Sequence, residues 1–240
     1  LAVGGRIVSR NGKFALGFFQ FQPASTISKS SQNTESPSPS LWYLGIWFNK
    51  IPVLTTVWIA NRDQPITNPS VNLTQLKISS DGNLVIVNHA ANNESIVWST
   101  HIVNNRTHSS IKATSSAVLL NSGNLVLKES RSSDLLAWQS FDYPTDTQLP
   151  GMKIGVDHRN GFAWNITSWS SPADPSPGEY TVKLLTGGLP EFFLFRGPVK
   201  IFTTGPWNGV VLTGVPELKT EEYTFALVSN PNETYGTYYI

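Results

Sequence analysis

Two carboxylates, Asp142 and Asp146, are the residues whose type and spacing most readily suggest catalysis. A pair of Asp or Glu side chains can act as general acid and base, or as acid and nucleophile, in the hydrolysis of a glycosidic bond. The residues between them, Tyr143-Pro144-Thr145, favour a turn rather than a catalytic cleft. We therefore interpret the pair as structural and regard a glycan-cleaving enzyme as the weakest functional alternative.

The sequence indicates no metal site, cofactor or other catalytic motif. Its four histidines lack the spacing of metal ligands, and we expect them in solvated loops: His89, His101, His108 and His158. It contains no cysteine, which excludes disulfides, thiolate nucleophiles and thiolate metal sites within the chain. Nucleophile elbows, phosphate-binding loops, dinucleotide fingerprints and kinase motifs are missing as well. We therefore expect a chain that is not an enzyme and needs no cofactor or metal.

The composition favours strands and turns over helices. Charged residues make up only 14% of the 240 residues, while Ser, Thr, Asn, Gly and Pro are abundant. The 17 basic residues nearly balance the 16 acidic ones, which argues against binding to nucleic acid or to an anionic membrane through bulk charge. Because no apolar run is long enough to span a bilayer and no signal peptide is visible, we expect a mature or trimmed fragment.

Five Asn-x-Ser/Thr sequons are candidate N-glycosylation sites: Asn72, Asn93, Asn105, Asn165 and Asn232. A sequence this rich in Asn, Ser and Thr would contain several sequons by chance. The five sequons nevertheless favour a secreted origin.

Three tryptophans recur at equal intervals of forty residues, at Trp58, Trp98 and Trp138. A second series runs in step, because Gly-Asn-Leu-Val occurs at residues 82–85 and again at 123–126. A fixed period of this size indicates one supersecondary unit used repeatedly, whose large indoles are buried where the copies meet. The eight tryptophans could alternatively form platforms that stack on sugars, but the phase of the repeat favours the core.

Trp207 is the exception among the tryptophans. It lies between Pro206 and Asn208 in a glycine-flanked turn, and we expect it to be exposed. We likewise expect Arg62 and Asp63 to form an ion pair on the surface.

Short apolar segments separated by turn residues predict an all-β chain without convincing helical periodicity. The expected strands are residues 7–8, 14–19, 41–48, 53–60, 76–78, 83–87, 95–99, 111–114, 117–120, 125–128, 179–185, 191–196, 200–204 and 223–228. Residues 22–40 are rich in Ser and Pro and predict a long exposed loop. We align Gly12 with Gly82 as the first copy of the glycine series and assign the extra spacing to this loop.

Prolines crowd residues 144–177 and, since proline breaks strand pairing, they suggest a change of domain. We place the boundary near residues 144–155. The predicted domains are residues 1–143 and residues 144–240.

The repeat resembles the bulb-type mannose-binding lectin domain, and further strings narrow the match. These strings are residues 57–66 (VWIANRDQPI), 138–147 (WQSFDYPTDT), 149–153 (LPGMK) and 205–209 (GPWNG). Together they resemble the ectodomain of a plant G-type lectin S-receptor-like kinase across nearly the whole sequence. The resemblance implies a β-prism of three four-stranded sheets about a pseudo-threefold axis. It also implies a second lectin-like domain, from the S-locus glycoprotein region, that is incomplete at its C-terminus.

The lectin resemblance also implies a mannose site of the form Gln-x-Asp-x-Asn-x-Val-x-Tyr on one strand. The best copy here retains Asp81, Asn83 and Val85 but has Ser79 and Val87 in place of Gln and Tyr. The copy at residues 120–128 retains only Asn and Val, and the copy at residues 9–17 retains nothing. Because each lost hydrogen bond costs on the order of 1 kcal/mol, we expect degenerate sites. Hairpin formation is the simpler role of the Asp-Gly-Asn sequence.

The resemblance implies a non-catalytic, extracellular recognition region whose kinase domain is absent from this chain. The implied ligand is a peptide, a lipid-like molecule or a glycan, and the receptor is expected to form a homodimer or hetero-oligomer. Residues 22–40 and 199–222 are the segments where we expect the ligand to bind. Membrane attachment would come only from a missing downstream segment, on the extracellular side of the plasma membrane. A free secreted mannose-binding lectin is the alternative.

Overall fold

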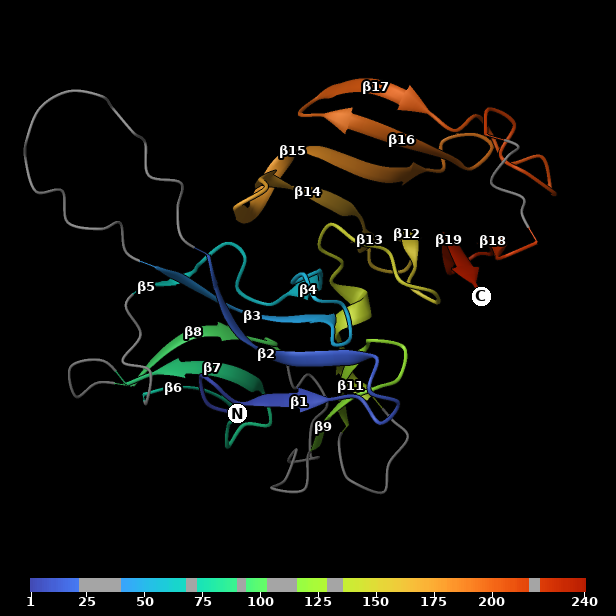
Figure 1. Cartoon of the computed structure of the whole chain (residues 1–240). Coiled ribbons are helices and arrows are strands. Elements are labelled where there is room, and N and C mark those ends of the chain that lie inside the picture. The colour runs from blue at the N-terminus through green and yellow to red at the C-terminus, as the bar shows by residue number, and fades with distance from the viewer. Residues whose placement is uncertain (22–39, 68–72, 90–93, 103–115, 129–135, 216–220) are drawn as a thin grey trace, which may run out of the picture.

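The computed structural model describes residues 1–21, 40–67, 73–89, 94–102, 116–128, 136–215 and 221–240. Throughout these residues the chain is all-β, as predicted, with antiparallel strands in five sheets and one short 3-10 turn, η2 (Ser140–Asp142). The first three sheets lie in the lower part of Figure 1 and the last two lie above and beside them. The predicted strand at residues 111–114 and the predicted loop at residues 22–40 fall almost entirely outside the described residues.

The first sheet has five strands in the order β1-β2-β3-β4, with β5 pairing to β3. Its strands are β1 (Arg6–Val8), β2 (Phe14–Phe21), β3 (Leu41–Phe48), β4 (Thr56–Ile59) and β5 (Ile66–Thr67). Strand β3 lies between β2 and β4, and its alternate residues Leu44 and Ile46 are fully buried in the core. Gly45 lies between them, where an added Cβ would meet the Phe19 ring and the Trp58 carbonyl at 2.7 Å.

The second and third sheets each have three described strands and share one plan. The second runs β6 (Thr74–Ile78), β7 (Leu84–Asn88), β8 (Ser95–Ser99), and the third runs β9 (Ser116–Leu119), β10 (Leu125–Lys128), β11 (Leu136–Gln139). In both, a glycine at positive φ, Gly82 or Gly123, turns the chain into the central strand. These turns match the Asp-Gly and Ser-Gly signals of the sequence.

The strand register corrects the first copy of the repeat. Trp98 pairs with Ile86 of β7, and Trp138 pairs with Leu127 of β10. In the first sheet Trp58 pairs with Ile46 of β3, whereas the strand that follows Gly12 is β2, one strand farther away. The equivalent of the Gly-Asn-Leu-Val strand is therefore β3, which lacks that sequence, and the alignment of Gly12 with Gly82 was wrong.

The three repeated tryptophans meet at one point. The Trp58, Trp98 and Trp138 rings lie 5.9–6.0 Å apart, centroid to centroid, in every pairwise combination, and each pair is edge-to-face. This geometry is favourable for aromatic rings. Trp58 and Trp138 belong to the buried hydrophobic cluster built from all three sheets, and the half-buried Trp98 packs against it. The expectation that the repeated indoles are core residues is confirmed for Trp58 and Trp138, while Trp98 is half-buried at the edge of the core.

The last two sheets form the second half of the chain. One runs β13 (Ala163–Trp164), β12 (Ile154–Asp157), β19 (Glu233–Tyr239), β18 (Thr224–Ser229). The other runs β14 (Ile166–Ser171), β15 (Asp174–Leu185), β16 (Glu191–Arg196), β17 (Val199–Thr203). A smaller cluster lies between them, built on Ile154, Leu184, Phe192 and Leu212. Leu149 and Met152 pack in the first cluster instead, and the domain boundary at residue 143 stays a prediction.

Two expectations about this half were wrong. Pro175 and Pro177 do not end the strand pairing, because β15 contains both and accommodates them with register shifts against β14. Trp207 is half-buried rather than exposed, because its ring packs against Phe225 at 5.7 Å. Its backbone N–H also donates to the Pro190 carbonyl at 2.9 Å.

Arg62 joins the two halves. Its guanidinium donates to the carbonyls of Pro175 at 2.8 Å, Thr167 at 3.2 Å and Ser168 at 2.8 Å. The residue is only 7% exposed, and burial lowers its pKa while nearby Asp146 partly offsets that effect. The predicted surface pair with Asp63 was wrong, since the donors of Arg62 face the β14–β15 backbone.

Aromatic side chains extend the same contact. Trp169 of β14 packs edge-on against Phe21 of β2 at 5.4 Å. It also adjoins a buried cluster of Phe19, Tyr43 and Ile59 in the first sheet. Burial, with a contribution from Asp174, raises the pKa of Tyr43 to about 12.

Candidate functional site

The best sequence candidate for a sugar site lies in the turn between β6 and β7. The Ser79 backbone N–H donates to the Asn83 carbonyl at 2.8 Å, and the Gly82 N–H donates to the Ser79 carbonyl at 3.0 Å. Asp81 accepts from the Ser79 hydroxyl, from the Asn83 backbone N–H at 3.2 Å and from the Asn83 side-chain amide at 3.0 Å. These contacts, with the Ser79 hydroxyl the largest cause, lower the pKa of Asp81.

The other end of the Asn83 amide points inward. Its oxygen accepts from the Thr100 hydroxyl at 2.8 Å and from the Ile102 backbone N–H at 2.7 Å. The Thr100 hydroxyl in turn accepts from the Leu84 N–H at 3.1 Å. Asn83 is only 8% exposed, and Val85 is buried at 2%. The structure thus brings Asp81 and Asn83 together, but their polar atoms bind the turn and the neighbouring strand.

The third sheet repeats this arrangement with different donors. The Asn124 amide oxygen accepts from the Ser140 hydroxyl at 3.1 Å and from the Phe141 N–H at 3.3 Å. Its amide nitrogen donates to the Gln139 side chain at 2.9 Å, and Ser140 accepts from the Leu125 N–H at 2.9 Å. The Asn of each Gly-Asn-Leu-Val copy therefore ties the central strand to the residues after the repeated tryptophan.

The turn at residues 9–14 forms the same kind of local hydrogen bonds, although it lacks the Gly-Asn-Leu-Val sequence. The Ser9 hydroxyl donates to the Asn11 side chain at 2.8 Å and accepts from the Phe14 N–H at 3.0 Å. Asn11 also accepts from the Lys13 N–H at 3.0 Å. This turn, too, is closed by its own polar side chains.

Asp142 and Asp146 serve local structure. Asp142 accepts from the Gln139 amide at 3.1 Å, and burial raises its pKa. Asp146 accepts from the Thr145 hydroxyl at 3.1 Å. Among the described residues no group of three His, Cys, Asp or Glu side chains could hold a metal ion. His158 contacts the Thr234 hydroxyl at 2.9 Å, and His108 falls outside the described residues.

Two of the five sequons fall within the described residues. Asn232 is exposed in the turn between β18 and β19, where its backbone N–H donates to Asn230 at 2.9 Å. Asn165 is half-buried between β13 and β14. Asn72, Asn93 and Asn105 lie outside the described residues, and glycosylation stays a prediction for all five.

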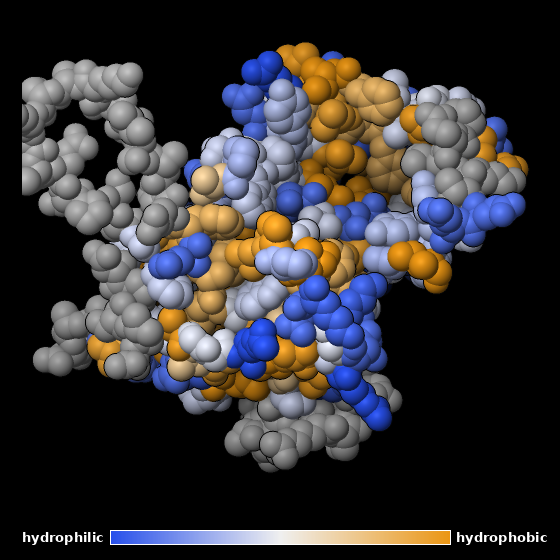
Figure 2. Space-filling view, viewed as in Figure 1, coloured by the Kyte–Doolittle hydropathy of each residue, from blue (hydrophilic) through white to orange (hydrophobic). Residues whose placement is uncertain are grey.

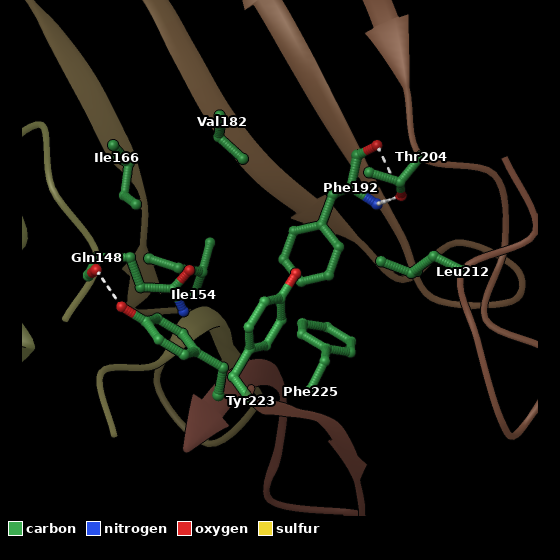
Figure 3. A pocket seen from close by; sticks show the side chains of 10 residues that line it. Gln148, Ile154, Ile166, Val182, Phe192, Thr204, Leu212, Tyr223 and Phe225 are labelled. Atoms are coloured by element: carbon green, nitrogen blue, oxygen red, sulfur yellow. Dashed lines mark hydrogen bonds between the residues drawn. The ribbon is translucent and has the colours of Figure 1, made fainter. Parts of the chain in front are cut away.

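An apolar cavity of about 450 Å³ opens between the two sheets of the second half (Figure 3). Its walls are mainly aliphatic and aromatic, and ten residues line it: Gln148, Ile154, Ile166, Val182, Phe192, Thr204, Leu212, Tyr223, Phe225 and Tyr238. The Tyr238 hydroxyl donates to the Gln148 carbonyl at 2.9 Å. Sequence reasoning missed this cavity because its residues come from six strands and two connecting segments, with no short motif.

Comparison with known proteins relates the region that contains the three repeated tryptophans to a lectin family. A family model described as D-mannose binding lectin matches residues 55–170. The chain is 42% identical over 219 residues to receptor-like serine/threonine-protein kinase SD1-8 of Arabidopsis thaliana. It is 40% identical over 235 residues to the G-type lectin S-receptor-like serine/threonine-protein kinase SRK of the same plant. It is 41% identical over 235 residues to the S-locus-specific glycoprotein BS29-2 of Brassica oleracea var. alboglabra.

These matches cover 90–97% of this chain but only part of each relative. The chain spans 23% of the SD1-8 kinase, 24% of SRK and 48% of the S-locus glycoprotein. Within the part of the chain that the structure describes, no helix is both long and apolar enough to cross a bilayer.

Proposed function

Because the chain belongs to the family of G-type lectin S-receptor-like kinases and S-locus glycoproteins, we propose that it is the extracellular ligand-recognition region of a plant receptor-like kinase. In this proposal the chain is non-catalytic, its mannose sites are degenerate, and it signals through a kinase domain that this chain lacks. The region faces the outside of the cell and is attached to the membrane by a segment downstream.

The proposed architecture is a β-prism followed by a second lectin-like unit. The mutual contact of Trp58, Trp98 and Trp138, one from each of the first three sheets, supports a pseudo-threefold axis. The described strands number five, three and three rather than four in each sheet. A rigid frame of this kind would present variable outer surfaces to a ligand.

The observation that carries the degenerate-site proposal is the use of Asp81 and Asn83 by their own turn. Both carboxylate oxygens of Asp81 and both ends of the Asn83 amide already have partners within the protein. A sugar hydroxyl would have to replace a bond at the Asn83 oxygen, which already accepts two, and could add one only at the exposed Asp81 carboxylate, so the net gain would be small. Val85, which would pack on the sugar ring, is buried.

A calorimetric titration with methyl α-mannoside tests this point. We expect no binding of methyl α-mannoside in the millimolar range. The Asp81→Ala variant should give the same titration as the unmodified chain. Mannose binding at millimolar concentration or better that Asp81→Ala abolishes would refute the degenerate-site proposal. Such a result would support the alternative, a secreted mannose-binding lectin.

We also propose that the complete receptor acts as a homodimer or hetero-oligomer when it binds a peptide, lipid-like or glycan ligand. The names of the relatives, which include receptor-like kinases, support a receptor role for the complete protein. A pull-down with the complete ectodomain, followed by measurement of its mass in solution with and without the captured ligand, tests it. A monomer under both conditions would contradict it.

A further inference from the structure

The sheet β14-β15-β16-β17 has one face turned to the core and one turned to solvent. Leu184 and Phe192 point into the core cluster between the sheets. Their neighbours in sequence therefore point the other way, since successive strand residues alternate between faces. We call this second side the outer face, and it carries Lys183 of β15, Phe193 and Phe195 of β16, and Lys200 of β17.

Two matching pairs of an aromatic ring and an ammonium group stand on the outer face. The Lys200 ammonium lies 4.1 Å from the centre of the Phe193 ring, and the Lys183 ammonium lies 5.4 Å from the centre of the Phe195 ring. The two ring centres are 6.3 Å apart. Lys183 is opposite Phe193 in the strand register, and Phe195 is opposite Lys200, so the pairs cross diagonally. The outer face thus carries two copies of one motif, a phenylalanine ring with a lysine ammonium against it.

The charge of these lysines is not neutralised locally. Neither Lys183 nor Lys200 has a carboxylate within ion-pair distance among the described residues. Of the nearby acids, Glu179 pairs with Arg196 at 2.8 Å, and Glu191 accepts from the Thr203 hydroxyl rather than pairing with either lysine. Contacts between an exposed ammonium and a ring are weak. An anion can therefore draw each ammonium away and free the ring face.

An open groove of about 780 Å³ adjoins the first of these pairs. Phe193 and Lys200 line it together with Leu185, Leu189, Glu191 and Pro206. The loop at its rim contains Gly187 and Gly188, and an added Cβ at either position would meet nothing within 4 Å. Figure 2 shows hydrophobic residues gathered in the upper part of the view, where β15–β17 lie. Among the described residues that line the groove, Lys200 is the cation and Glu191 is the carboxylate, so the groove combines apolar walls, one charge of each sign and room at the rim.

We propose that the outer face binds an acidic oligosaccharide, a chain of pyranose rings that each carry a carboxylate. Such a ligand has the two features that the motif repeats: a flat C–H face that packs on an aromatic ring and an anion that pairs with a lysine. Successive sugar units would occupy the Phe193–Lys200 and Phe195–Lys183 pairs. This inference rests on the proposed recognition function and names a ligand class for a site that is far in sequence from Asp81.

A neutral oligosaccharide offers the same ring faces without the anions. Comparing it with the acidic form therefore separates the contribution of ring stacking from that of ion pairing with the lysines. The probe is a defined oligogalacturonide, and the control ligand is its fully methyl-esterified form. Binding to the 240-residue chain is measured by calorimetry at low and at physiological salt. We expect the acidic form to bind at least tenfold more tightly and to weaken as salt rises, because salt screens exposed charges.

Three variants locate the site. Lys200→Met keeps the aliphatic stem, and Phe193→Leu keeps an apolar side chain, so both are expected to fold, which far-ultraviolet dichroism checks. We expect each to weaken oligogalacturonide binding about tenfold. The matched control Lys77→Met removes a lysine on β6 that pairs with Glu94 at 2.8 Å, and it should bind like the unmodified chain.

The proposal is overturned if the acidic and esterified probes bind equally, if neither binds, or if Lys200→Met and Lys77→Met behave alike. An acidic peptide that binds more tightly than the oligogalacturonide would also overturn it. Failure of this test leaves the wider recognition role standing, since that role is judged by the pull-down and by the mannose titration.

Discussion

At the scale of single residues, the side chains that look like ligand contacts are the ones that build the turns. Asp and Asn next to Gly close a hairpin by bonding their own backbone, and Asp81 and Asn83 do so here. Asn83 and Asn124 go further, because each also accepts a hydrogen bond from a hydroxyl group two residues after a repeated tryptophan. The sequence therefore singled out Asp81 and Asn83 but could not distinguish sugar binding from turn formation, since both roles use the same polar atoms.

Asn83→Ala should lower the free energy of unfolding by about 1–3 kcal/mol, because it strands the Thr100 hydroxyl and the Ile102 N–H without an acceptor. Urea denaturation measures the change. Ser170→Ala, at an exposed position of β14, is the control and should stay within about 0.5 kcal/mol of the unmodified chain. Equal stability of the two variants would show that the Asn83 bonds are not structural.

Asp157 predicts a dependence of stability on acid pH. Its carboxylate accepts from the Arg159 backbone N–H at 3.0 Å and from the Arg159 guanidinium at 2.6 and 2.9 Å. The Arg159 side chain is the main cause that lowers the pKa of Asp157 to about 2. A carboxylate with a lowered pKa stabilises the fold fully above its unfolded pKa of about 3.9 and loses that contribution as the pH falls through about 2.

Asp157→Asn removes this titration, so the stability difference between the two proteins should shrink as the pH falls from about 5 to about 2. Unfolding free energies at a series of pH values measure it. A difference that stays constant over this range would rule out a link to Asp157.

At the scale of elements, periodicity and turn chemistry predicted most strands well. The predicted strands at residues 41–48, 95–99, 125–128 and 191–196 coincide with β3, β8, β10 and β16. Six strands have no counterpart among the predicted ranges: β5, β11, β12, β13, β14 and β19. Around β12 and β14, proline and serine suggested loops. Pro175 and Pro177 fit inside β15 because register shifts against β14 absorb the lost ladder bonds. That compensation depends on the partner strand and cannot be read from local sequence.

Trp138→Ala should cost about 3–5 kcal/mol, because it removes a buried ring that contacts Trp58, Trp98 and Tyr143. Leu136→Ala on the same strand is the matched control, since Leu136 is 45% exposed, and it should cost far less. Thermal and chemical unfolding measure both. A loss for Trp138→Ala no larger than for Leu136→Ala would contradict a shared aromatic core.

At the scale of the whole molecule, the contact that joins the two halves is made by Arg62, whose partner the sequence analysis predicted wrongly. Arg62 and Asp63 read as a surface pair, yet Arg62 crosses to the second half and donates to three carbonyls separated from it by more than 100 residues. Contacts of this length depend on the packed arrangement of sheets, which no local pattern encodes. The cavity between the last two sheets escaped prediction for the same reason.

Arg62→Lys should destabilise the chain by about 2–4 kcal/mol, because a lysine cannot present the fork of donors that reaches three carbonyls. It should also make the two halves unfold in separate steps, which differential scanning calorimetry would resolve as two transitions. Arg10→Lys, at an exposed position, is the control. A single transition at the unmodified temperature for Arg62→Lys would show that the halves are held together by other contacts.

The meeting of three indoles has an optical consequence. Rings about 6 Å apart, one from each of the first three sheets, couple their electronic transitions, so the near-ultraviolet dichroism of this chain should contain a signal that belongs to the trio rather than to any one ring. Displacing a single sheet would erase that signal, which gives a label-free reporter for the integrity of the first half while ligands are screened against the second.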